Sequence, residues 1–194
     1  MLEWKLSKDQ FRFLSNCHIL DAIGVAQECV HSIKKRKLKA IVLKIDLIKA
    51  YDRADWSFLR LVLLQIVLHV EVMKWIMACI STANFAIMID GRATDGFKSS
   101  IGLRQGCPLS PLLFFLVIKG LSLMINYAKS KKSIQGIRFS HSLSISHILF
   151  VDDMLIFGRG SMEEWSCYHS IISLFCYASG MMVSAEKMYF SLKC

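Results

Sequence analysis

The sequence has few of the residues that interrupt or separate folded units. Its 194 residues include two prolines and ten glycines, and no stretch is dominated by proline, glycine or serine. No segment of the chain repeats. Linkers and repeat arrays carry those features, so their scarcity argues against several flexibly joined units. We expect one compact unit, because a chain of this length suits a single domain or a large part of one.

The cysteines lack the spacing of a metal site or a disulfide framework. There are seven of them, an odd number, and no two have the two-residue separation of a zinc knuckle. Reduced and mostly buried thiols are therefore the expected state, as in nuclear or cytoplasmic proteins.

Uninterrupted apolar runs of membrane-spanning length are also missing. Gln65 and His69 divide one apolar stretch and Lys119 divides another, whereas a membrane span needs about 20 largely apolar residues in succession. The first ten residues, MLEWKLSKDQ, are charged throughout and lack the apolar centre of a signal peptide. We expect an intracellular protein, nuclear or cytoplasmic, with no membrane partner.

What the chain does contain is ample apolar material and an excess of positive charge. Apolar residues make up 54% of the sequence, enough for a core, and the formal net charge is +9. The excess is compatible with a polyanionic partner but does not identify one. The basic run Lys34–Lys39 allows two interpretations. It is either a solvated helix end stabilised by the helix dipole or a patch that contacts phosphates.

Helical and strand patterns alternate along the chain, with hairpin signals between them. Asp90-Gly91 is typical of a type I′ hairpin turn, Asp55 is a candidate helix cap, and Ser161 with Glu164 predicts a capping box. This mixture favours an α+β layered domain. The predicted helices cover residues 20–37, 56–68, 71–81, 108–129 and 162–179, and the predicted strands cover 40–47, 84–90, 94–99, 145–151, 154–157 and 188–192.

Two adjacent acids, Asp152 and Asp153, lie between apolar runs that predict two strands. Carboxylates placed side by side in a tight turn repel each other, and the neighbouring sequence offers them no obvious cation. A divalent metal bound to the pair would explain the arrangement.

Asp46 is the second unusual acid, because it lies within or at the end of the apolar strand pattern IVLKID. Such a carboxylate is costly unless it is paired, hydrogen-bonded or metal-bound, although a cap on the following turn is an alternative. If this strand lies beside the hairpin of Asp152 and Asp153, three carboxylates meet. Oxygen ligands favour Mg²⁺ or Mn²⁺, and two such ions would support nucleotidyl transfer. Two nearby acids have structural explanations. Asp52 would pair with Arg53 or another base, and Asp55 would cap a helix.

A loop signal separates these acids, in the segment Gly102–Pro111. Arg104 and Gln105 offer several donors to a phosphate or a base edge, and Gly106 permits close approach of a ligand. Taken alone, the segment is better explained as an ordinary junction between a loop and a helix.

Four segments in this order resemble the reverse transcriptase domain of non-LTR retrotransposons, particularly the plant long interspersed type. A further segment, residues 10–35, resembles the finger region that precedes the first motif. The four motif segments are LKIDLIKAYDRADWSFL (43–59), GLRQGCPLSPLLF (102–114), SHILFVDDMLIF (146–157) and ASGMMVSAEKMYF (178–190).

The resemblance implies the fold, the activity and the partners. The fold would be the reverse-transcriptase palm, an antiparallel sheet backed by helices, with a finger remnant at about 1–40 and the palm at about 41–194. The thumb would be absent. The activity would be RNA-directed DNA polymerisation with two Mg²⁺ ions, or Mn²⁺, acting on an RNA template, a DNA primer and a deoxynucleoside triphosphate. An organellar intron maturase would share this chemistry. The resemblance implies no oligomeric state.

The resemblance also implies roles for individual residues. Asp46, Asp152 and Asp153 would bind the metals, and Leu47 would add a backbone carbonyl. Tyr51 would lie under the incoming sugar and select against a 2′-hydroxyl.

The remaining implied roles concern the nucleotide. Gln105 and Gly106 would contact the incoming nucleotide and template, beside Arg104. Lys187 would lie near the pyrophosphate and could protonate it, although a solvated lysine before a strand is an equal alternative.

The chain departs from the family pattern at several places, two of which bear on the nucleotide site. Asn16-Cys17 stands where the family usually has Gly-Arg, and Cys107 stands where it commonly has aspartate. These departures and the missing thumb leave a second hypothesis open, in which the chain is a catalytically inactive retrotransposon relic with residual nucleic-acid binding.

Overall fold

A single antiparallel sheet forms the centre of the domain in the computed structural model, which describes residues 19–66, 68–139, 144–150, 153–184 and 189–191. Its central strand is β1 (Ile41–Ile48). On one side β1 pairs with β9 (Asp153–Gly158), and β9 pairs with β8 (His147–Phe150). On the other side β1 pairs with β10 (Met182–Val183) and β11 (Tyr189–Ser191). All these pairings are antiparallel, which confirms the predicted α+β class.

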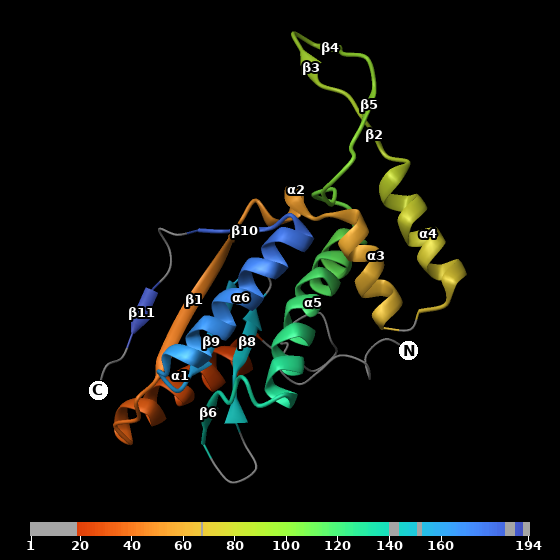
Figure 1. Ribbon diagram of the computed structural model, residues 1–194. Helices are drawn as coiled ribbons and strands as arrows, with labels where there is room; N and C mark the ends of the chain where they lie inside the picture. Colours follow the sequence, from red (N-terminus) through yellow and green to blue (C-terminus); the bar gives the residue numbers. More distant parts are fainter. Residues whose placement is uncertain (1–18, 67, 140–143, 151–152, 185–188, 192–194) are drawn as a thin grey trace.

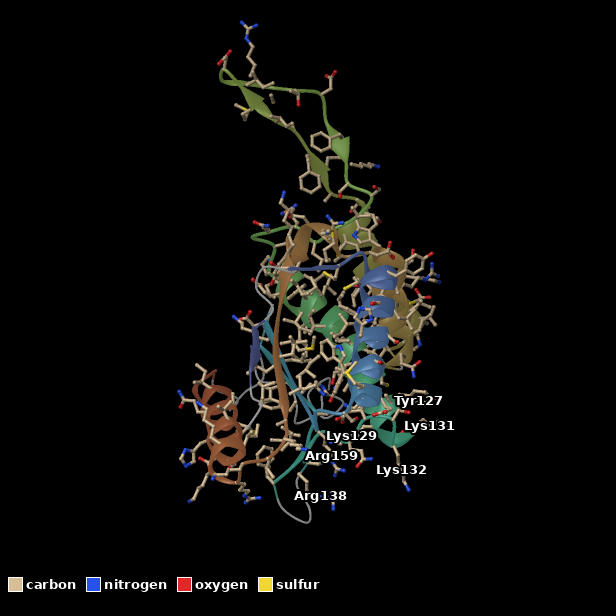
Figure 2. All side chains as sticks on the ribbon, turned by 60° about the vertical axis from the view of Figure 1, so that its left-hand side comes forward. Tyr127, Lys129, Lys131, Lys132, Arg138 and Arg159 are labelled. Atoms are coloured by element: carbon tan, nitrogen blue, oxygen red, sulfur yellow. The ribbon has the colours of Figure 1, made fainter. Side chains whose placement is uncertain are left out.

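Helices cover both faces of this sheet (Figures 1 and 2). The larger core lies under α3 (Trp56–Gln65), α5 (Ser110–Ser130) and α6 (Met162–Ser179), where Leu43 and Ile45 of β1 are fully buried. Side chains alternate along a strand, so their neighbours point to the opposite face.

On that opposite face α1 (Ile19–Lys35) packs over one end of the sheet. Its buried residues Cys29 and Ile33 share a cluster with Val42 and Phe157. Ile23, nearer the start of the helix, is 40% exposed. Val25 and Ala26 are half-buried against the same cluster, so among the described side chains the helix packs on the sheet from Val25 onward.

The long helix α5 runs through the middle of the larger core. It is long and apolar enough to cross a membrane, although the sequence pattern predicted no such segment. Of the most apolar 18 residues of this helix, 61% is buried inside the domain. Its apolar composition is therefore that of a helix in a protein core. Gly120 allows the close approach of α3, because a Cβ there would lie 2.7 Å from the ring of Phe58.

Three helices and a β arm follow β1. α2 (Ala50–Arg53) precedes α3, whose cap is confirmed, because the Asp55 carboxylate accepts a hydrogen bond from Phe58 N. α3 ends at Gln65, earlier than predicted, and α4 (Val70–Ser81) begins after a cap by His69.

The arm projects from the body of the domain beyond α4 (Figure 1). Its tip is the predicted type I′ turn, in which Asp90 and Gly91 have φ values of 46° and 78°. The strands of the arm are β2 (Asn84–Phe85), β3 (Met88–Ile89), β4 (Arg92–Ala93) and β5 (Phe97–Lys98).

The capping box predicted for α6 forms only in part. Ser161 accepts a hydrogen bond from Glu164 N, and Gly180 ends the helix with φ 73°. The Glu164 side chain, however, accepts hydrogen bonds from the backbone of Gln135, Gly136 and Arg159. A small strand pair lies near this contact, β6 (Ile137–Arg138) with β7 (Ser144–Ile145). No sequence pattern predicted β6, whereas Ile145 of β7 falls at the start of the predicted strand 145–151.

Candidate active site

Asp46 and Asp153 lie directly opposite each other on adjacent antiparallel strands. Residues paired in this way project to the same face of a sheet, with Cβ atoms about 5 Å apart. Asp46 is half-buried and the side chain of Asp153 is 40% exposed. The structure therefore brings together two of the three acids that the sequence singled out.

A lysine accompanies these acids. The Nζ atom of Lys44 lies 3.0 Å from Oδ2 of Asp153, and alternation along β1 places Lys44 on the same face as Asp46. The residues next to Asp153 in the sequence offered no cation, and its partner comes instead from a distant part of the chain. Sequence distance concealed the partner, because Lys44 comes close only through the register of β1 and β9.

Two predicted site residues, Asp152 and Lys187, lie outside the described residues. Phe150 and Asp153 are strand partners, which confirms the predicted antiparallel pairing of the runs on either side of the two acids. Leu47 is half-buried and pairs with Val183. Its role as a carbonyl ligand stays a prediction.

Tyr51 lies just beyond the end of β1, in α2. Its ring stacks on Phe114 with 4.6 Å between centroids, and its backbone carbonyl accepts a hydrogen bond from Leu103 N at 2.7 Å. These contacts attach the start of the glycine-containing loop to the segment that follows Asp46. The ring is half-buried, so one part of it packs in the core while another reaches the surface.

The loop at residues 102–107 is held against that segment by further hydrogen bonds. Gly102 N donates to the Ala54 carbonyl at 2.9 Å, and Trp56 Nε1 donates to the Gly102 carbonyl at 2.7 Å. Gly102 has φ 85°, and a Cβ there would lie 2.7 Å from the Asp52 carbonyl oxygen. Glycine is therefore required at this position, both for its conformation and for the contact.

The predicted nucleotide-contacting residues follow in the same loop. Gln105 Nε2 donates to Oδ1 of Asp52 at 3.3 Å, so the partner of Asp52 is not Arg53. Arg53 instead donates through Nε to the Gly180 carbonyl. Arg104 and Gly106 are exposed, and Gly106 has φ 81° with open space beside it.

A cavity of about 690 Å³ lies beside this loop. It is formed by the loop, the end of α4 and the base of the arm, and its volume is that of a small-molecule site. The sequence indicated the loop residues but not the cavity walls, because α4 and the arm approach the loop only in the fold. The lining residues include Asp52, Trp56, Cys79, Ile80, Phe85, Phe97, Ser99, Arg104, Gln105 and Cys107.

Cys107 lies at the edge of this cavity and before the first turn of α5. A hydrogen bond from the Leu109 backbone is the main cause that lowers the pKa of its thiol, with contributions from Ser110 and from the charge of Arg104. The sulfur thus accepts hydrogen bonds from the helix start. An aspartate at this position would make the same kind of contact.

The donor set fits a hard divalent cation in part. Asp46 and Asp153 supply carboxylate oxygens from one face, which suits Mg²⁺ or Mn²⁺ better than zinc. Among the described residues no group of three or more histidine, cysteine, aspartate or glutamate side chains is placed to hold a metal. A complete three-acid site therefore depends on Asp152.

Comparison with known proteins agrees with this arrangement. Residues 2–194 match the family described as reverse transcriptase (RNA-dependent DNA polymerase). The chain belongs to the reverse transcriptase family. Over 160 residues it is 29% identical to the Pol polyprotein of the type-1 retrotransposable element R2 of Popillia japonica, which covers 81% of this chain and 25% of that protein. The predicted resemblance to non-LTR retrotransposons is confirmed.

Two other relatives match shorter parts of this reverse transcriptase domain. An uncharacterized mitochondrial protein of Arabidopsis thaliana is 43% identical over 67 residues, which is 34% of this chain and 55% of the relative. The transposon TX1 149 kDa protein of Xenopus laevis is 27% identical over 101 residues, 52% of this chain and 8% of the relative. The chain thus spans between 8% and 55% of these three relatives.

Solved telomerase structures share the fold of the domain. Telomerase from Candida tropicalis, in complex with a TWJ fragment of telomeric RNA, superposes with a TM-score of 0.68 and 15% identity over 95% of this chain and 30% of that one. Telomerase from Candida albicans superposes with a TM-score of 0.66 and 13% identity, over 91% of this chain and 30% of that one. The palm-type fold predicted from the motifs is therefore confirmed.

Proposed function

We propose that the domain carries out the nucleotidyl-transfer step of RNA-directed DNA synthesis, adding a deoxynucleotide to a primer 3′-hydroxyl. The observation that carries the proposal is the pairing of Asp46 with Asp153 across two strands. Family membership supports it, because the chain matches the reverse transcriptase family over residues 2–194.

The metal ligands in this proposal are Asp46, Asp152 and Asp153, with the Leu47 carbonyl as an additional oxygen. Two bound Mg²⁺ ions would activate the attacking hydroxyl and stabilise the charge on the leaving phosphate oxygen. Before a metal binds, Lys44 balances the charge of Asp153. Both side chains are about 40% exposed, so this ion pair is weak and a divalent cation can displace the lysine.

The cavity beside the glycine-containing loop is the proposed nucleotide site. Arg104 supplies a positive charge at its wall, and Gln105 is oriented by its hydrogen bond to Asp52. Tyr51, fixed by its stack on Phe114, would limit the space under the sugar. Lys187 would protonate the departing pyrophosphate. The template would be RNA and the primer DNA.

Single-nucleotide incorporation on a primed RNA template tests the proposal. We expect the chain to extend the primer with Mg²⁺ and the matching nucleotide, and Asp153→Asn to lower the rate by at least about a hundredfold, because removing one electrostatic group at a reacting centre costs that much. Asp90→Asn is the matched control. It makes the same change in the arm turn, where asparagine suits the positive φ.

Two results would contradict this function. One is extension by Asp153→Asn at the rate of the unsubstituted chain. The other is binding of the primed template without any incorporation, which would support the relic hypothesis instead.

A further inference from the structure

Basic side chains gather at one end of the domain (Figure 2), at the other end of β9 from Asp153. β9 begins at Asp153, and Arg159 directly follows its last residue. Arg159 comes six positions after Asp153 in nearly extended chain, which is about 20 Å at roughly 3.3 Å per residue. We call this region the basic pole, and its residues are Tyr127, Lys129, Lys131, Lys132, Arg138 and Arg159.

Hydrogen bonds hold the segments of the basic pole together. Lys129 Nζ donates to the Ser144 carbonyl at 2.8 Å, and Ser144 is the strand partner of Arg138. The Glu164 carboxylate accepts hydrogen bonds from the backbone N–H groups of Gly136, at 2.9 Å, and of Arg159. The end of α5, strand β6 and the turn after β9 therefore form one surface.

The positive charge of this surface is not neutralised by ion pairs. Four of its five basic residues are exposed, and no ion pair involves any of the five within the described part of the chain. The buried acid beneath them, Glu164, is 6% exposed and is already committed to backbone donors. Glu163, at the start of the same helix, is exposed and leaves the pole with a clear excess of positive charge.

The basic run at the end of α1 extends this surface. Arg36 donates through Nη1 to the carbonyl of Phe139 at 2.8 Å, and Phe139 is the neighbour of Arg138. Five of the six residues in Lys34–Lys39 are lysine or arginine, and all five are exposed. The run therefore continues the basic pole across β6.

An exposed aromatic ring lies within this charge. Tyr127 is 65% exposed, and Lys131 Nζ lies 5.5 Å from the centroid of its ring. An exposed ring among cations binds the flat face of a nucleobase, while the cations bind the phosphates on either side. Duplexes hide their base faces in the stack, whereas single strands present them.

We propose that the basic pole is a second nucleic-acid-binding surface, which takes single-stranded RNA or DNA independently of the polymerase site. Lysine and arginine side chains contact the phosphates, and Tyr127 stacks on a base. Binding there needs neither a divalent metal nor a nucleotide, so it can be measured apart from the proposed polymerase activity.

Fluorescence anisotropy with a labelled oligouridine strand tests the charge contribution, in EDTA and across a salt series. In single strands each phosphate contact contributes about 0.7 to the slope of log K against log[salt]. The double variant Lys131→Gln/Lys132→Gln should therefore lower the slope by about 1.4. Arg60→Gln/Lys74→Gln removes the same charge from exposed helix positions elsewhere and should leave the slope unchanged. An equal decrease of this slope in both double variants would overturn the proposal.

Tyrosine variants test the stacking contribution. Tyr127→Ala should weaken binding of the single strand about fivefold to a hundredfold, since stacking on an aromatic side chain contributes about 1–3 kcal/mol per base. Tyr127→Phe keeps the ring and should bind normally, as should Tyr177→Ala, which removes another exposed tyrosine. Unchanged binding by Tyr127→Ala, or tighter binding of a duplex of equal length, would overturn the proposal. An oligothymidine strand compares DNA with RNA in the same assay.

Discussion

At the scale of single residues, the fold brings together two of the three acids that looked unusual in the sequence, Asp46 and Asp153. Asp46 was identifiable because a carboxylate within an apolar strand needs a partner, and Asp153 because it adjoins another acid. Lys44 was not identifiable, since its contact with Asp153 depends on strand register. The sequence pattern indicates which charged side chains need a partner. Strand register decides which residue that partner is.

Cys107 provides a residue-scale test of the cavity. Thiolates are the reactive form, and hydrogen bonds at the start of α5 lower the pKa of Cys107, whereas burial raises the pKa of Cys29 to about 11. Near neutral pH, iodoacetamide should therefore modify Cys107 much faster than Cys29, as measured by mass spectrometry of the digested protein. Because Cys107 lines the cavity, a bound deoxynucleoside triphosphate should slow its modification.

The nucleotide effect has an internal control in Cys176, whose thiol pKa is raised by burial and which does not line the cavity. Its slow modification should not respond to nucleotide. If the nucleotide also leaves the rate of Cys107 modification unchanged, the nucleotide does not bind in this cavity.

At the scale of elements, local signals were reliable where the chemistry is local. The Asp55 cap, the Ser161 cap and the Asp90-Gly91 turn all form as predicted. Glu164 did not follow its local pattern, because three backbone donors from β6 and β9 loops reach it in the fold. The β6–β7 pair and β10 are two residues per strand, too short to give a periodic signal.

Glu164 gives the element-scale prediction. Glu164→Gln should lower the free energy of unfolding by about 2–3 kcal/mol. A glutamine side chain has only one oxygen that accepts hydrogen bonds, so its NH₂ group would face at least one of the backbone N–H donors. Urea denaturation followed by circular dichroism measures the change. Glu163→Gln, the exposed neighbour, should stay within about 0.5 kcal/mol. Equal stability of the two variants would show that the three-donor contact does not hold these loops.

At the scale of the whole molecule, one sheet connects the paired acids with the basic pole. The acids lie where β1 ends and β9 begins, and the basic pole lies at the other end of β9. The motifs predicted the fold and the site loop because they are ordered along the chain. They could not predict the cavity, whose walls come from α4 and the arm, or the basic pole, whose residues come from three separate segments.

The most direct test of the central claim is a titration of the chain with Mn²⁺, followed by electron paramagnetic resonance of the free ion. Binding requires only the carboxylates, so it needs neither a primer nor a nucleotide. We predict that Asp46→Asn and Asp153→Asn each weaken Mn²⁺ binding at least about tenfold, while Asp90→Asn has no effect.

The Lys44–Asp153 contact makes the same titration more specific. Lys44→Gln should tighten Mn²⁺ binding by up to about fivefold, the range of an exposed ion pair, since the lysine competes for Asp153. The account predicts weaker binding without either acid and tighter binding without the lysine. Equal Mn²⁺ affinity in the unsubstituted chain, Asp46→Asn and Asp153→Asn would contradict it.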